Sequence, residues 1–165
     1  MNPEDRFLKE YEENVDAVFR FCYFKLSDKE LAQDLTQESW SKAWMYITSG
    51  QEVENMKAFV FKIARNLIID QYKKHKTLSL EDMVADGFDP SFDERRMIED
   101  RAELENVLCA INKLPEDNRE IVLMRFLEDL SVQEIAKVVG DNPNNVSVKI
   151  HRIMKEIRED HKKHD

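Results

Sequence analysis

Glycine, proline and cysteine are scarce in this chain of 165 residues, which holds three glycines, four prolines and two cysteines. Few helix-breaking residues, together with many leucine, glutamate, lysine and alanine residues, favour an all-α fold. The chain has no glycine-rich loop that would hold a phosphate group. Cys22 and Cys109 stand singly on apolar helix faces, without a CxxC or Cys/His cluster. This placement predicts buried thiols rather than a disulfide or a zinc site.

Long apolar runs and catalytic groupings are also lacking. No apolar run is long enough to cross a bilayer, and the N-terminal MNPEDRFLKEYEE is too acidic and polar for a signal peptide. We therefore expect a cytoplasmic protein without membrane insertion. The sequence shows no paired carboxylates, no nucleophile with a base and no metal-ligand cluster, so we expect no enzyme, no cofactor and no bound metal. His161 and His164 form an HxxH in the tail, where a solvated, frayed terminus is the simpler interpretation.

Acidic residues exceed basic ones, but unevenly along the chain. The net charge of −9 alone argues against a protein that coats DNA. Residues 78–103 hold three basic and nine acidic side chains, which is two thirds of the excess. Residues 57–77 instead carry six lysines and arginines and the single acid Asp70. The acidic excess is therefore local, and a polyanion would meet clustered basic groups elsewhere.

The stretch from Leu130 to Arg158 has the pattern of two short helices joined by a tight turn. Ser131 with Glu134 forms a capping box, and Gly140 ends the first helix. Asn142 followed by Pro143 begins the second. The apolar residues recur at helical spacing in both helices, at Val132, Ile135, Ala136 and Val139 and then at Val146, Ile150, Ile153 and Ile157.

The second of these helices carries hydroxyl, amide and basic groups opposite its apolar side. Amides and arginine can pair with base edges, while lysine and a helix N-terminus suit phosphates. This pattern is typical of a helix-turn-helix whose second helix enters a major groove. An ordinary helical hairpin with a solvated basic face remains the alternative on this stretch alone.

Residues 1–77 predict a first domain of three helices. Asn2-Pro3 begins a helix that runs to about Leu26, with a buried stripe of Phe7, Tyr11, Val15, Val18, Phe19 and Cys22. Ser27 and Glu30 predict a capping box for a second helix, which ends before Gly50. Its core side comprises Leu31, Leu35, Ala43, Trp44 and Ile47. Its polar side brings together Asp34, Gln37, Glu38 and Lys42, which would also suit a merely solvated face.

A loop from Ser49 to Asn55 leads to a third predicted helix, whose inward residues are Phe59, Ile63 and Leu67. Around them runs a basic stripe of Lys62, Arg65, Asn66, Lys73, Lys74 and Lys76. Phe61 and Tyr72 are interleaved with this stripe. Basic groups beside aromatic rings are typical of single-stranded nucleic-acid binding. The alternative is that both rings lie in the core and the lysines only keep the surface soluble.

From Leu78 to about Arg96 no periodicity persists, which predicts a flexible acidic linker over residues 78–103. Residues 104–165 then form the second domain. A helix over about 97–114 and one opened by Pro115 join the helix-turn-helix, which predicts a four-helix domain. The helix after Pro115 has a large expected buried face of Ile121, Val122, Met124, Phe126 and Leu127.

Taken in order, these stretches resemble the extracytoplasmic-function (ECF) sigma factors of bacterial RNA polymerase, small two-domain members of the sigma-70 family. The run AQDLTQESWSKAW resembles region 2.2 of that family, and ENMKAFVFKIARNLIIDQYKK resembles regions 2.3 and 2.4. LPEDNREIVLMRFLEDLSVQEIAKVVG with NNVSVKIHRIMKEIRE resembles region 4. The resemblance covers nearly the whole chain. It implies an alternative-sigma transcription initiation factor, with region 2 in residues 1–77 and region 4 in residues 104–165.

The resemblance also implies partners and contact residues. By this resemblance, Asp34, Gln37 and Glu38 dock on the clamp helices of the largest subunit of core RNA polymerase. The resemblance assigns capture of the unpaired non-template strand of the −10 element to seven residues, namely Asn55, Met56, Lys62, Arg65, Asn66, Lys73 and Lys74. Reading of the duplex −35 element falls to Asn144, Asn145, Ser147, Val148, Lys149, His151, Arg152 and Lys155. A cognate anti-sigma factor is a further implied partner.

Two positions depart from the family's pattern, and two other functions fit parts of the sequence. Asp141 stands where the family usually has an apolar residue, and Phe59 where it usually has tryptophan. The first rival function is a homodimeric helix-turn-helix regulator that acts without being a polymerase subunit. The second is a helical interaction or anti-regulator module whose basic faces are only solvated. Association with core polymerase distinguishes a sigma factor from both.

Overall fold

A computed structural model describes residues 2–75 and 109–163, and every element in this part of the chain is helical. The predicted all-α fold is confirmed there. None of the described helices is long and apolar enough to span a membrane. The chain divides into two compact units, Met1–Asp89 and Pro90–Asp165. The predicted acidic linker and the two tail histidine side chains lie outside the described residues.

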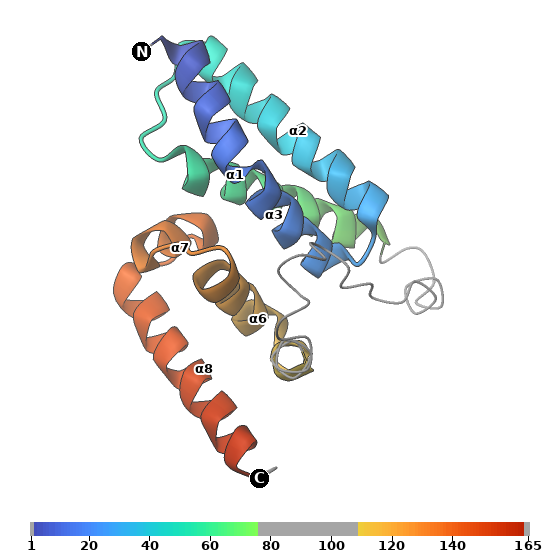
Figure 1. Cartoon of the computed structure of the whole chain (residues 1–165), viewed down its shortest axis with the longest axis vertical. Helices are drawn as coiled ribbons and strands as arrows, with labels where there is room; N and C mark the ends of the chain where they lie inside the picture. The colour runs from blue at the N-terminus through green and yellow to red at the C-terminus, as the bar shows by residue number, and fades with distance from the viewer. Residues whose placement is uncertain (1, 76–108, 164–165) are drawn as a thin grey trace. The chain divides into compact units, whose positions relative to one another are not determined.

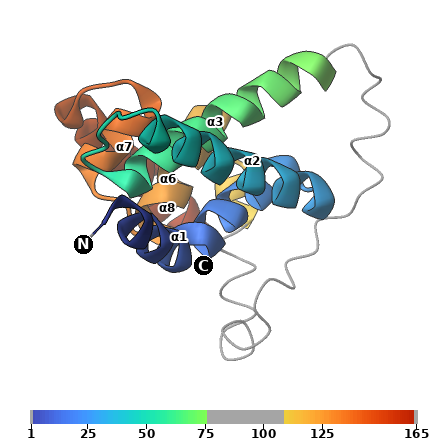
Figure 2. The same ribbon diagram turned by 90° about the horizontal axis from the view of Figure 1, so that it is seen from above.

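The first unit consists of α1 (Pro3–Leu26), α2 (Lys29–Thr48) and α3 (Met56–His75). Asn2 begins α1 as expected, because its side-chain oxygen accepts a hydrogen bond of 2.8 Å from the backbone N–H of Asp5. α1 and α2 lie side by side, and α3 packs against both (Figure 1). The same three helices can be followed from above in Figure 2.

The junction between α1 and α2 differs from the expected capping box at Ser27 and Glu30. Ser27 ends α1 in a left-handed conformation, with a φ of 55°, and its N–H donates to the carbonyl of Tyr23. Asp28 is the residue that caps α2, accepting from the N–H of Leu31 at 3.1 Å. Serine and aspartate both suit this position, and the two-residue connection leaves room for one cap only.

The buried side of the first unit is also rotated from the predicted one. Of the expected α1 stripe, Val18 and Cys22 are buried, while Tyr11 is exposed. Phe21, which was not predicted, has no exposed surface, and Trp40 of α2 is buried against Phe7 and Tyr11. Burial raises the pKa of the Cys22 thiol to about 11, so it stays protonated at neutral pH.

The second unit contains α6 (Glu116–Val122), the π-helical turn η1 (Leu123–Leu127), α7 (Val132–Val139) and α8 (Pro143–Lys163). Of the helix expected over 97–114, residues 109–114 are described; residues 109–112 are helical, and the helix ends before the turn at 113–114. Cys109 is exposed, so the prediction of a buried thiol is wrong there.

Within residues 2–75 and 109–163, no group of three or more His, Cys, Asp or Glu side chains is arranged to hold a metal ion.

The π-helical turn explains one further error in the predicted core. Ile121, Val122 and Met124 are buried as expected, but Phe126 is 49 % exposed. In η1 the N–H of Glu128 donates to the carbonyl of Leu123, five residues back, rather than four. A π-helical turn contains more residues than an α-helical turn, so the following side chains are rotated about the helix axis. Phe126, which a continuous α-helix would place in the core, therefore lies at the surface.

Candidate nucleic-acid and polymerase interfaces

The predicted helix-turn-helix is present in α7 and α8. Ser131 and Glu134 form a reciprocal capping box, with hydrogen bonds of 2.9 and 3.1 Å between side chain and backbone. Gly140 ends α7 at a φ of 73°, where a side chain would be strained. Asn142 then caps α8, accepting from the N–H of Asn145 at 2.8 Å. Because both helix ends are specified locally, the turn between them is fixed.

One side of α8 anchors it to its unit. Val146 and Ile153 are buried against a core that includes Ile135, Ala136 and Val138 of α7. Val138 was missed by the sequence pattern, whereas the expected Val139 is half-buried. Burial of these residues sets the rotation of α8 about its axis, and this decides which side chains remain outside.

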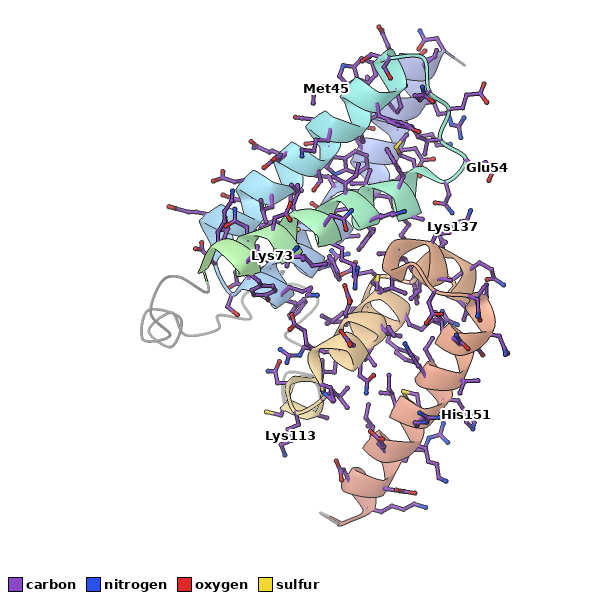
Figure 3. The ribbon with its side chains drawn as sticks, turned by 180° about the vertical axis from the view of Figure 1, so that it is seen from behind. Met45, Glu54, Lys73, Lys113, Lys137 and His151 are labelled. Atoms are coloured by element: carbon purple, nitrogen blue, oxygen red, sulfur yellow. The ribbon has the colours of Figure 1, made fainter. Side chains whose placement is uncertain are left out.

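The opposite side of α8 is the surface that we call the reading face. All eight residues assigned to it from the sequence are exposed, namely Asn144, Asn145, Ser147, Val148, Lys149, His151, Arg152 and Lys155. Figure 3 shows His151 on the outer side of α8, away from α6. Val148 is 48 % exposed, which suits an apolar contact such as a thymine methyl. The structure thus brings the predicted −35 residues together.

Asp141 lies just before α8 and contacts this face. Its carboxylate accepts from the N–H of Asn142 at 2.8 Å and from Nδ2 of Asn145 at 3.0 Å. Nζ of Lys149 lies 3.4 Å from Oδ2 of the same carboxylate. The pKa of Asp141 is lowered, first by the Asn145 side chain and next by the Asn142 backbone, so the group is charged at neutral pH.

A second polar surface follows α3. Lys62, Asn66 and Lys73 are exposed and follow one another at intervals of four and seven residues, so they share one face of the helix. We call this row the α3 basic face. Arg65 is half-buried and Lys74 is exposed. Figure 3 shows Lys73 near the C-terminal end of α3, which extends the face along most of the helix.

The two aromatic rings predicted beside this row do not lie on it as stacking platforms. Phe61 has no exposed surface, and its ring centroid lies 5.3 Å from that of Phe21 in α1. Tyr72 is half-buried and donates its hydroxyl proton to the carbonyl of Lys25. The alternative of a core position is therefore correct for Phe61, whereas Tyr72 is only half-buried and is held through its hydroxyl. Phe59 packs against Tyr46 of α2 at 4.9 Å between ring centroids, as expected for a structural aromatic.

At the N-terminal end of α3 lies a cavity of about 850 Å³. It is lined by the loop residues Gly50 to Glu54, together with Arg6, Phe7 and Met56. Met56 itself is buried, and Asn55 caps α3 by accepting from the N–H of Ala58 at 3.0 Å. Sequence patterns did not indicate Arg6, whose guanidinium lies 3.5 Å from the carbonyl oxygen of Val53, because the two residues are far apart along the chain.

The third candidate surface is the outer side of α2, where Asp34, Gln37 and Glu38 are all exposed. Glu38 forms an ion pair with Lys42 at 3.8 Å, and such exposed pairs contribute little to stability. Trp40 lies on the opposite side of α2, packed against α1. The three polar residues therefore form a solvent-facing patch that packing within the first unit does not use.

Comparison with known families identifies both units. Residues 10–78 match the model for sigma-70 region 2, and residues 104–157 match the model for sigma-70, region 4. The chain belongs to the sigma-70 family. It is 32 % identical to the ECF RNA polymerase sigma factor BldN of Streptomyces coelicolor over 155 residues, covering 92 % of this chain but 58 % of BldN. It is 27 % identical to the ECF sigma factor SigM of Bacillus subtilis over 152 residues, covering 90 % of each.

These relatives place the chain in the ECF group of sigma factors. Among solved structures, the sigma factor RpoE of Bartonella quintana, determined in complex with the anti-sigma factor NepR, matches with a TM-score of 0.71 at 23 % identity. That match covers 93 % of this chain and 95 % of RpoE, and it shows that this sigma factor shares the RpoE fold.

Proposed function

We propose that this sigma factor binds bacterial core RNA polymerase, directs it to promoters with specific −10 and −35 elements, and contributes to opening of the duplex. The observation that carries the proposal is the reading face of α8, whose eight predicted residues are all exposed on a helix with a locally capped start. Polar and basic side chains arranged in this way suit the major groove. We infer that the protein acts in the cytoplasm and has no catalytic activity of its own.

We assign the contacts to three parts of the chain. Residues 1–77 dock on the polymerase through Asp34, Gln37 and Glu38 and hold the unpaired −10 strand. In this role the α3 basic face contacts the backbone, and the adjoining cavity is large enough for an extruded base. Residues 78–103 link this part to residues 104–165, which read the −35 element. Exposed apolar side chains such as Leu8 and Met45 support a further protein partner, which we propose is an anti-sigma factor.

Co-elution with sigma-free core RNA polymerase tests the proposal without knowledge of the promoter. We expect the full chain to co-elute on a sizing column and the Asp34→Ala/Gln37→Ala variant to bind about tenfold more weakly or worse, because exposed interface residues can each contribute about 1 kcal/mol or more. The matched control is Glu12→Ala/Glu13→Ala, which removes two exposed polar groups from α1. We expect this control to co-elute like the unaltered chain.

Other outcomes would identify other functions. A folded chain that does not bind core polymerase, but runs as a dimer and binds palindromic DNA tightly, would instead be a homodimeric helix-turn-helix regulator. Equal weakening by both double variants would show that the outer side of α2 is not the docking surface.

Replacing Arg152 tests the reading face itself. We expect Arg152→Ala to weaken promoter binding by the polymerase complex by about 1 to 3 kcal/mol and to relax sequence choice, as for an arginine that contacts a base edge. The exposed position of Arg152 predicts an unchanged unfolding midpoint. Binding constants for the promoter and for single-base variants check this. Equal losses on all sequences would show that Arg152 contacts only phosphate.

A further inference from the structure

The reading face contains one acidic residue that interacts directly with two residues assigned to DNA. Asp141 lies just before α8, and its carboxylate contacts Nδ2 of Asn145 at 3.0 Å and Nζ of Lys149 at 3.4 Å. Both partners are exposed, and Lys149 retains 48 % of its side-chain surface. The contacts are therefore made at the surface that DNA would approach, not in the core.

The chemistry of a carboxylate determines what these contacts do to Asn145. An ionised carboxylate only accepts hydrogen bonds, so the amide of Asn145 must direct Nδ2 toward Asp141. The side-chain oxygen of Asn145 and its second N–H are then left for another partner. A base that donates a proton, such as adenine through N6 or cytosine through N4, satisfies that oxygen.

The same carboxylate forms an ion pair with the ammonium group of Lys149. A lysine on this face would otherwise be available to a phosphate, and each phosphate neutralised by a protein cation releases condensed counterions from DNA. To contact a phosphate, Lys149 must exchange the Asp141 carboxylate for it. Asp141 also brings a negative charge to the N-terminal end of α8, where a DNA phosphate would otherwise be attracted.

We propose that Asp141 is a positioning residue of the reading face, which orients Asn145 and competes with DNA phosphate for Lys149. Competition for Lys149 lowers the affinity of the reading face for DNA of any sequence. The oriented side chain of Asn145 still selects the base. The inference rests on the proposed −35 role of α8 and extends it, because it makes an acidic side chain a determinant of sequence choice.

The test measures binding of a duplex of random sequence by the full chain with core RNA polymerase, using filter binding at about 0.05 to 0.3 M salt. Four proteins are compared: the unaltered chain, Asp141→Asn, Lys149→Gln and the variant with both changes. Asp141→Asn keeps an oxygen that can accept from the N–H of Asn142 but removes the charge. Thermal unfolding of each variant controls for a loss of structure in α8.

We expect Asp141→Asn to bind about five- to tenfold more tightly at about 0.1 M salt and to steepen the dependence of log K on log salt by about one, since one more phosphate is neutralised. Lys149→Gln should then remove most of this gain when it is combined with Asp141→Asn, and it should weaken binding more in the Asp141→Asn background than in the unaltered chain. Duplexes selected from a random pool by the Asp141→Asn complex should also be less restricted in their −35 sequences.

Four outcomes would overturn the inference. An unchanged salt dependence in Asp141→Asn, or an equal effect of Lys149→Gln in both backgrounds, would show that Asp141 does not compete for Lys149. A purely structural Asp141 would lower the unfolding temperature and weaken binding in Asp141→Asn. Failure of all four complexes to bind DNA would overturn the proposed function together with the inference, whereas the other outcomes leave the proposed function intact.

Discussion

Replacement of Phe61 with alanine should destabilise the first unit by about 3 to 5 kcal/mol, the usual cost of removing a buried aromatic ring. Phe61 has no exposed surface and packs against Phe21 of α1, which is equally buried. The substitution would leave a cavity between α1 and α3 that these rigid helices cannot close. The free energy of unfolding of a small domain is usually only a few kcal/mol larger than this loss. A large fraction of the first unit should therefore unfold.

Urea unfolding of the full chain, followed by circular dichroism, measures this loss. The matched control is Lys62→Ala, the neighbouring residue, which is exposed on the α3 basic face. Its unfolding free energy should change by less than about 0.5 kcal/mol, while binding of the −10 strand by the polymerase complex weakens. A Phe61→Ala protein of unchanged stability that binds single strands poorly would instead mean that Phe61 stacks on bases.

Replacement of Ile153 with alanine should destabilise the second unit by about 2 to 5 kcal/mol. Ile153 is 2 % exposed and lies on the side of α8 that faces the core of the unit. Its neighbour Arg152 lies on the reading face, so substitutions at these two adjacent residues should differ in their effect on stability. Ile153→Ala lowers stability and thereby promoter binding, whereas Arg152→Ala lowers binding alone.

The two effects are separated by measuring stability and promoter binding on the same protein preparations. Binding by Ile153→Ala should recover on cooling toward the temperature of greatest stability, since the loss comes from unfolding, whereas binding by Arg152→Ala should not. An Ile153→Ala protein with unchanged unfolding but relaxed sequence choice would show that Ile153 faces DNA rather than the core.

The helix-turn-helix was predictable from sequence because its determinants are local. Ser131, Glu134, Gly140 and Asn142 each act on backbone groups within a few residues, and each has the conformation or hydrogen bond expected of it. The exposure of the reading face then follows from helical periodicity, since the apolar side of α8 is narrow.

The buried faces of the first unit were less predictable. Residues 15–24 of α1 are largely apolar around the helix, so periodicity alone does not decide between Phe19 and Phe21. Contact with α3 selects Phe21, and this is a tertiary effect. The cavity beside the loop 50–54 depends in the same way on Arg6 and Phe7 of α1, which are distant in sequence. The π-helical turn likewise has no composition signal, and it leaves Phe126 exposed.

The packing of α2 on α1 gives the first unit its own optical signal. The chain has two tryptophans, Trp40 and Trp44, and both pack against Phe7 of α1. Residues 104–165 contain none. Indole fluorescence therefore reports on the first unit only, and the second unit contributes nothing to it. Phe61→Ala should shift the fluorescence transition in urea, while Ile153→Ala should change circular dichroism and leave that transition in place.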